Sequence, residues 1–145
     1  NQSVEDISSI LNKVDLDIIQ LHGNENIDDY TIFNKDIINT IHASENIQSQ
    51  LSKINLNKHM HLIDATDNQM RGGSGTTFDW NILKDLNCEK LFIAGGLKPD
   101  NILDLLSRYT PKCVDVSSGI ERKVGYKDHK IMSDFVETIR TYYEK

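Results

Sequence analysis

Two stretches in the last third of the chain decide the fold: Leu91-Phe92-Ile93-Ala94-Gly95-Gly96-Leu97 and Cys113-Val114-Asp115-Val116-Ser117-Ser118-Gly119. Each starts with a short apolar run, typical of a buried strand, and ends in a loop of glycine or serine. Each is followed by a segment with helical spacing, from Pro99 to Arg108 and from Asp128 to Tyr143. The two stretches therefore predict two consecutive strand–helix units.

The rest of the chain repeats this order. Ser3 is a suitable N-cap for a first helix, Ser3 to Val14, and acidic residues follow it at the positive end of the helix dipole. The predicted strands are Leu16 to Leu21, Asp36 to Ile41, Met60 to Asp64, Leu91 to Ala94 and Cys113 to Val116. The helices predicted after them are Glu25 to Phe33, Ser44 to Ile54, Asp79 to Leu86, Pro99 to Arg108 and Asp128 to Tyr143. Because parallel neighbours need long crossovers, this order predicts an α/β fold with five parallel strands.

Five such strands fit either an open doubly wound sheet or part of an eight-stranded barrel, which needs about 250 residues, or about 200 in compact examples. A length of 145 residues favours the open sheet. The placement of polar and glycine residues at the carboxyl ends of the strands favours the barrel. Barrels of this kind often bind phosphate with the loops after their last two strands and a helix N-terminus.

Composition limits the function classes. The net charge of −6 and the pI of about 5.3 argue against general binding to nucleic acid or to an anionic membrane. There is no apolar run of about 18 residues and no signal-peptide pattern, so a cytoplasmic protein is expected. Cys88 and Cys113 lack the spacing of a disulfide framework or a zinc site. With no shift in composition along the chain, residues 1–145 are expected to form a single domain or part of one.

The glycine loops and Asp64 each allow two interpretations. An isolated glycine pair more often marks a turn with positive φ than a ligand site, but two such loops after consecutive strands shift the balance toward phosphate. Asp64 ends an apolar strand, where burial would raise its pKa and suit it to act as a general acid. An aspartate after a strand is more commonly a cap or a loop-stabilising residue.

Two further features are less specific. The segment from Arg71 to Thr77 predicts either a loop that closes over a site or a linker, and its central residues are Gly72, Gly73, Ser74 and Gly75. His59 and His61 lie on one face of a strand without a set of metal ligands and are interpreted as a polar strand entrance. His42 and His129 indicate nothing specific.

Six segments, in order, resemble the successive motifs of the phosphoribosylanthranilate isomerase family. They are Gln20-Leu21-His22-Gly23, Leu62-Ile63-Asp64, Gly72-Gly73-Ser74-Gly75-Thr76-Thr77-Phe78-Asp79-Trp80, Ala94-Gly95-Gly96-Leu97-Lys98-Pro99-Asp100-Asn101, Val114-Asp115-Val116-Ser117-Ser118-Gly119-Ile120-Glu121 and Gly125-Tyr126-Lys127-Asp128. Each segment alone is a weak signal, but the ordered set extends over essentially the whole chain.

The resemblance implies a partial TIM (β/α)8 barrel, with the five strands here as its fourth to eighth and residues 1–145 as its C-terminal two-thirds. It implies an Amadori rearrangement of N-(5-phosphoribosyl)anthranilate to 1-(2-carboxyphenylamino)-1-deoxyribulose 5-phosphate in tryptophan biosynthesis. Asp64 matches the general acid, and His22 and Asp115 match residues that line the substrate. The loop at 72–75 matches the active-site loop, and no metal or organic cofactor is implied. The phosphate is assigned to Gly95, Gly96, Ser117, Ser118 and Gly119.

The family's general base is a cysteine in a Lys-x-Cys-Gly segment, and these 145 residues contain no such segment. The isolated chain is therefore expected to be nearly inactive. Two alternatives stay open: another phosphate-binding barrel enzyme of tryptophan or histidine biosynthesis, and a non-catalytic fragment that binds phosphorylated sugars. The second alternative would self-associate through exposed strand edges.

Overall fold

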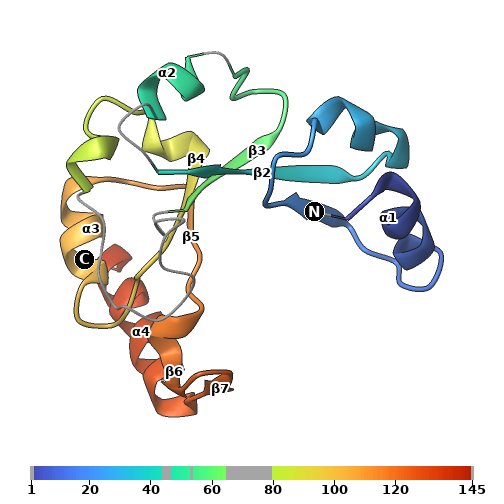
Figure 1. Cartoon of the computed structure of the whole chain (residues 1–145). Coiled ribbons are helices and arrows are strands. Elements are labelled where there is room, and N and C mark those ends of the chain that lie inside the picture. The colour runs from blue at the N-terminus through green and yellow to red at the C-terminus, as the bar shows by residue number, and fades with distance from the viewer. Residues whose placement is uncertain (1, 44–46, 53, 65–79, 145) are drawn as a thin grey trace.

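The computed structural model describes residues 2–43, 47–52, 54–64 and 80–144. Its main sheet contains five parallel strands whose spatial order follows the chain order. They are β1 (Ile18–Leu21), β2 (Asp36–His42), β3 (Met60–Asp64), β4 (Leu91–Ala94) and β5 (Cys113–Val114). Figure 1 shows the strands toward the middle of the molecule and helices around them. The predicted α/β fold with five parallel strands is confirmed.

The strand order distinguishes between the topologies considered from the sequence. A doubly wound sheet reverses its strand order at the crevice where ligands bind. No reversal occurs along β1-β2-β3-β4-β5, where each strand pairs with its neighbour in the chain. The described sheet therefore lacks the topology of the doubly wound alternative.

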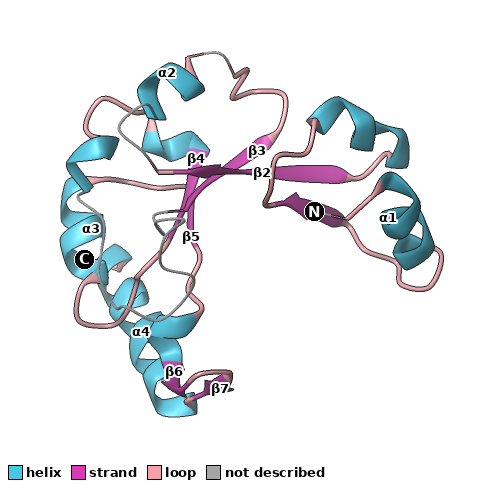
Figure 2. Cartoon of the chain, viewed as in Figure 1, coloured by secondary structure: helices cyan, strands magenta, loops and turns pink. Residues whose placement is uncertain are grey.

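Most helices of the described residues have three to eight residues, and the last helix is longer, with 15; Figure 2 shows the helices in cyan. The α-helices are α1 (Val4–Leu11), α2 (Ile47–Leu51), α3 (Ile102–Arg108) and α4 (His129–Tyr143). The 3-10 helices are η1 (Ile27–Phe33), η2 (Trp80–Leu83), η3 (Cys88–Lys90) and η4 (Ser118–Ile120). Ser44 and Asp79, the first residues of two predicted helices, lie outside the described residues.

The helix predicted from Glu25 to Phe33 is a 3-10 helix, η1, and not an α-helix. Asn26 caps it, and β-branched residues at Thr31 and Ile32 lower the α-helical propensity of this segment. It ends at Asn34, whose φ of 51° is left-handed. The strand–helix alternation is thus preserved here with a tighter and shorter helix.

Side-chain caps fix the two ends of the chain. The Ser3 hydroxyl accepts from the Asp6 N–H (3.1 Å) and the Asp6 carboxylate accepts from the Ser3 N–H (3.2 Å), which forms a capping box on α1. The Asp128 carboxylate accepts from the N–H groups of Lys130 (2.9 Å) and Ile131 (3.1 Å) and so starts α4. Both helix starts agree with the sequence prediction.

A two-stranded antiparallel hairpin lies between β5 and α4 and was not predicted. It consists of β6 (Glu121–Lys123) and β7 (Tyr126–Lys127), with Gly125 at a φ of 78° in the turn. Its strands are too short for the alternation that marks a strand in sequence. The hairpin follows the last strand of the main sheet and holds the loop before it, as described below.

The apolar core has two parts. The larger packs β2, β3 and β4 against α3 and α4, with Ile63, Leu91 and Ile93 fully buried. The smaller joins β1 to α1 and η1 around Leu21 and Tyr30. No helix among the described residues is long and apolar enough to cross a membrane. β1 and β5 are the edges of the described sheet, and self-association through strand edges stays a prediction.

His61 lies inside the core, so its interpretation as part of a polar strand entrance is wrong. It is the second residue of β3 and its exposed fraction is 0%. Burial lowers the pKa of His61, the nearby His59 acts in the same direction, and the Asn55 backbone acts against them. The imidazole is therefore held neutral where the surrounding chain is apolar.

The buried imidazole makes the stability depend on pH. Because the pKa of His61 is lower in the folded state, its contribution is present above the unfolded imidazole pKa of about 6.5 and is lost as the pH falls below it. We expect the urea midpoint to fall between about pH 7.5 and about pH 5.5, and His61→Leu to reduce that fall. His129→Gln changes an exposed histidine and serves as the control. An equal fall in His61→Leu and in the unmutated protein would contradict this account.

Candidate functional site

Three polar side chains meet where the first three strands end. His22 directly follows β1, His42 is the last residue of β2 and Asp64 is the last residue of β3. His42 and Asp64 are register partners in the parallel pair, and the Ala43 N–H donates to the Asp64 carbonyl (2.7 Å) just beyond it. The parallel strands therefore bring these three residues together at the carboxyl ends of the strands.

The side chains of this group are in contact. His22 Nε2 lies 3.2 Å from Asp64 Oδ2, and the rings of His22 and His42 are 5.3 Å apart between centroids at an angle of 54°. Asp64 is buried, with 7% of its surface exposed, whereas His22 is exposed. A carboxyl group in the wall of the site thus shares a hydrogen-bonding contact with an imidazole that faces solvent, an arrangement suited to proton transfer.

His42 was missed from the sequence because its strand was predicted to end one residue too early. The apolar residues of β2 end at Ile41, so His42 was assigned to the following loop. Asp64 ends β3 in the same manner and is its partner in register. If the carboxyl ends of the two predicted strands had been aligned with each other, His42 would have been recognised as the neighbour of Asp64.

The glycine and serine loops after β4 and β5 are packed directly against each other. Gly95 and Gly96 have φ angles of 94° and 65°, so the turn interpretation applies to this pair. A Cβ at Gly119 would lie 1.7 Å from the Leu97 carbonyl oxygen. The absence of a side chain at Gly119 is therefore required for the contact between the two loops.

The predicted ligand residues of the second loop are open to solvent. Ser117, Ser118 and Asp115 are exposed, and η4 begins at Ser118. The Asp115 N–H donates to the Ile93 carbonyl (2.9 Å), which continues the pairing of β5 with β4 beyond the strand itself. Backbone N–H groups in glycine loops near a helix start are well suited to hold a phosphate.

Two side chains that were not singled out as ligand residues brace these loops. Asn101 donates from Nδ2 to the Gly96 carbonyl (2.9 Å) and accepts from the Lys98 N–H (2.9 Å). Lys127 donates from Nζ to the carbonyl oxygen (2.7 Å) and the hydroxyl oxygen (3.2 Å) of Ser117. Both residues are in the quoted motifs, but only the folded chain shows what they contact.

Glu121 completes the support from the hairpin. It accepts from Lys127 Nζ (2.8 Å), and this hydrogen bond, together with one from the Gly125 N–H, lowers the pKa of its carboxyl group. The carboxylate thereby holds the ammonium group against the Ser117 loop. A fixed positive charge beside this loop would favour an anionic ligand.

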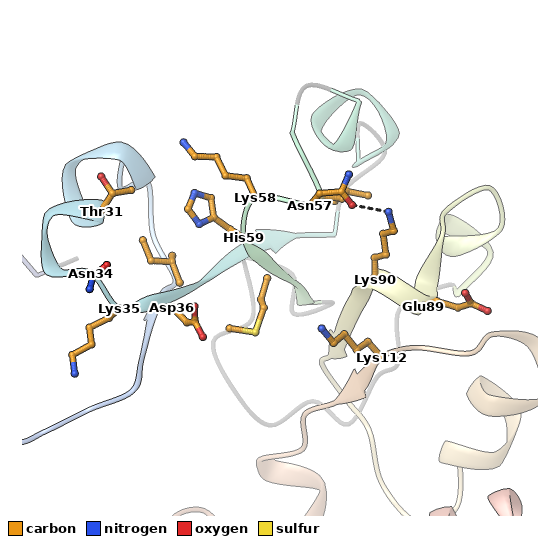
Figure 3. A pocket seen from close by; sticks show the side chains of 13 residues that line it. Thr31, Asn34, Lys35, Asp36, Asn57, Lys58, His59, Glu89, Lys90 and Lys112 are labelled. Atoms are coloured by element: carbon orange, nitrogen blue, oxygen red, sulfur yellow. Dashed lines mark hydrogen bonds between the residues drawn. The ribbon is translucent and has the colours of Figure 1, made fainter.

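A large hollow lies at the amino ends of the strands, opposite the group of His22, His42 and Asp64 (Figure 3). Its volume is about 780 Å³, and Asp36 and Met60, the first residues of β2 and β3, are in its wall. It contains several lysines, of which Lys90 donates to Asn57 Oδ1 (2.7 Å). No predicted site residue lines this hollow, so it is separate from the group at the carboxyl ends of the strands. Gly72, Gly73, Ser74 and Gly75 lie outside the described residues.

Fold and site together define a parallel α/β protein with its polar residues and glycine loops at the carboxyl ends of the strands. The family model of N-(5'-phosphoribosyl)anthranilate (PRA) isomerase matches residues 1–138. The chain belongs to this family.

Individual relatives agree with that assignment. The isomerase of Legionella pneumophila strain Corby is 37% identical over 134 residues, which are 92% of this chain and 65% of that protein. The chain therefore spans about two-thirds of the length of this relative. The solved isomerase of Thermotoga maritima has a TM-score of 0.81 at 30% identity, with 97% of this chain and 70% of that chain covered. A second solved isomerase, in complex with reduced 1-(o-carboxyphenylamino)-1-deoxyribulose 5-phosphate, has a TM-score of 0.76 at 27% identity over 97% and 68% of the two chains.

The contact between Gly119 and Leu97 can be tested by adding one methyl group. Gly119→Ala must displace the Leu97 carbonyl, and we expect it to lower the free energy of unfolding by about 1–3 kcal/mol and to shift the Leu97 amide resonance. Gly125→Ala is the matched control, because its Cβ meets nothing within 4 Å and only the positive φ carries a cost, of about 1 kcal/mol. An unshifted Leu97 amide in a fully stable Gly119→Ala protein would show that the two loops are not in contact.

Proposed function

We propose that the protein is an N-(5'-phosphoribosyl)anthranilate isomerase, which rearranges N-(5-phosphoribosyl)anthranilate to 1-(2-carboxyphenylamino)-1-deoxyribulose 5-phosphate in tryptophan biosynthesis. The contact between His22 Nε2 and Asp64 Oδ2 is the observation that carries this proposal. It lies at the carboxyl ends of the strands, where an α/β protein of this family binds its ligand. The related isomerase solved with a reduced form of the product supports the same class of ligand for this chain.

The proposed fold is a (β/α)8 barrel in which β1 to β5 are the fourth to eighth strands and residues 1–145 act as one domain. The sequential parallel order of the five strands supports this placement. The share of the relatives that the chain spans, 65% to 70%, is slightly above five-eighths, in keeping with five strand–helix units preceded by one further helix, α1.

Asp64 is the proposed general acid. In its protonated form it gives a proton to the ribose ring oxygen, and the ring opens to a Schiff base. Loss of the C2′ proton to a base then gives an enolamine, which becomes the ketone. His22 lies against the carboxyl group and is proposed to line the substrate with Asp115. Residues 72–75 are proposed to form the active-site loop.

The proposed phosphate site consists of the two loops that meet at Gly119. Gly95, Gly96, Ser117, Ser118 and Gly119 provide backbone N–H and hydroxyl groups without large side chains in the way. Lys127 adds a positive charge that is fixed on Ser117 and Glu121. This local charge offsets the net charge of −6 at the one place where an anion would bind.

Neither cysteine of the chain is suited to be the general base. Cys88 is buried in the core, and burial raises the pKa of its thiol. Cys113 is the first residue of β5 and lies in register with Phe92 and Leu62, two residues before the level of Asp64. Partial desolvation of its thiol and the nearby Asp115 raise the pKa of that thiol. The proposal therefore assigns the base to a cysteine in a segment other than these 145 residues.

Complementation tests the proposal that the general acid and the general base lie on different segments. We expect the 145-residue chain, assayed by loss of substrate fluorescence in EDTA, to turn over at least about 100-fold faster when a peptide with the first three strands of a family member is added. The same peptide with its Lys-x-Cys-Gly cysteine changed to serine should not restore activity. Equal rates with and without the peptide would contradict the proposed source of the base.

The role of Asp64 is tested in the complemented protein. Asp64→Asn keeps the shape of the side chain but removes the proton donor, so we expect kcat to fall about 100-fold to 10,000-fold. Asp104→Asn changes an exposed carboxylate on α3 that pairs with Arg108 and should leave kcat unchanged. If Asp64→Asn retains the unmutated kcat, Asp64 is not the general acid.

A further inference from the structure

We propose that His22, His42 and Asp64 form a binding site for a divalent transition-metal ion such as Zn²⁺, which inhibits the protein when bound. The site is empty in this structure. Nothing in the proposed rearrangement requires a metal ion, so this site adds a second ligand to the same group of residues.

The three side chains have the donor atoms and spacing of a metal site. One donor atom from each, two imidazole nitrogens and a carboxylate oxygen, all lie within 4.8 Å of one another. Bond lengths of about 2.0–2.2 Å in a tetrahedral zinc site place two donors about 3.3 Å apart. The His22 Nε2 to Asp64 Oδ2 distance of 3.2 Å already has this value. The remaining donor–donor distances are at most 4.8 Å.

The backbone holds these donors in place before any ion binds. His42 and Asp64 are partners in the parallel register of β2 and β3, and the hydrogen bond from the Ala43 N–H to the Asp64 carbonyl closes the two strand ends. His22 follows β1, which pairs with β2 along its whole length. Sites on paired strands lose little entropy when they bind, because their backbone is already ordered.

The surroundings of His42 give an independent reason to expect a ligand. Its Nδ1 atom is buried and has no hydrogen-bond partner within the described part of the chain. A buried polar atom without a partner destabilises the folded state. Coordination of a metal ion through Nδ1 would give this atom a partner.

The donor types select the class of metal ion. Imidazole nitrogens bind Zn²⁺, Co²⁺ and Ni²⁺ well, whereas Mg²⁺ and Ca²⁺ prefer oxygen ligands. Three protein ligands leave further coordination positions for water or an anion, and the half-exposed His22 side chain leaves the ion a route from solvent. An ion here would hold the Asp64 carboxylate oxygen and prevent the carboxyl group from donating a proton.

Metal binding can be measured without substrate. We expect calorimetric titration of the purified protein, free of any histidine tag, to show one equivalent of Zn²⁺ and no saturable binding of Mg²⁺. His42→Gln removes one ligand and should weaken Zn²⁺ binding at least about 10-fold. His129→Gln removes an exposed histidine on α4 and should leave it unchanged.

Co²⁺ spectroscopy identifies the ligands. The visible bands of the bound ion should be present in the unmutated protein and in His129→Gln and be lost in His42→Gln, with no thiolate charge-transfer band. A thiolate band would assign the ion to the exposed Cys113 and overturn the proposal. Equal Zn²⁺ affinity in His42→Gln and the unmutated protein would also overturn it.

The inhibition is tested separately from the activity itself. This inhibition rests on the proposed function and is measured on the chain complemented with the peptide of the first three strands. In EDTA the complemented protein should turn over without any metal, and added Zn²⁺ should inhibit it more strongly than complemented His42→Gln. Activity in EDTA with no metal binding would overturn the metal site and leave the isomerase proposal standing. Metal binding by a complemented protein that shows no turnover in EDTA would leave the metal site standing and overturn the isomerase proposal.

Discussion

His42 and Asp64 are neighbours across a parallel strand pair, and the candidate site depends on the register of that pair. Side chains alternate between the two faces of a sheet, so a shift of one residue would turn one member of the pair to the opposite face. The buried residues Ile41 and Ile63, which precede them and are also partners, hold the register because both belong to the core. Packing of the sheet therefore determines which polar groups meet at the carboxyl ends of its strands.

The other part of the site depends on a different constraint, the lack of a side chain at Gly119. Its close approach to the Leu97 carbonyl joins the loops after β4 and β5. Lys127 then fixes Ser117 from the side of the hairpin. Asp64 and the two glycine and serine loops are thus supported independently, Asp64 by strand register and the loops by a close backbone approach.

Much of the fold could be predicted from the sequence because the apolar runs are short and clearly bounded. The bounds of β3 and β4 agree with the prediction, and the five strands have the expected order. Helix type and length were less predictable, since β-branched residues such as Thr31 and Ile32 in η1 lower the propensity for a full α-helix.

The residues of the candidate site, like the fold, could be predicted only in part. The family resemblance assigned Asp64 and His22 to one site, and the structure brings these two side chains into contact. His42 and Lys127 were not recognised, because their roles come from contacts between segments distant in the chain. Such contacts leave no local pattern in the sequence.

The central claim is that the ligand site lies at the carboxyl ends of the strands. The lysine-containing hollow at the amino ends of the strands is not the ligand site. Titration of the protein with inorganic phosphate, followed by amide nitrogen–proton NMR, tests this most directly. The account predicts that the shifts concentrate at Gly95, Gly96, Ser118 and Gly119. Shifts concentrated instead at the hollow, around Lys58 and Lys90, would contradict it.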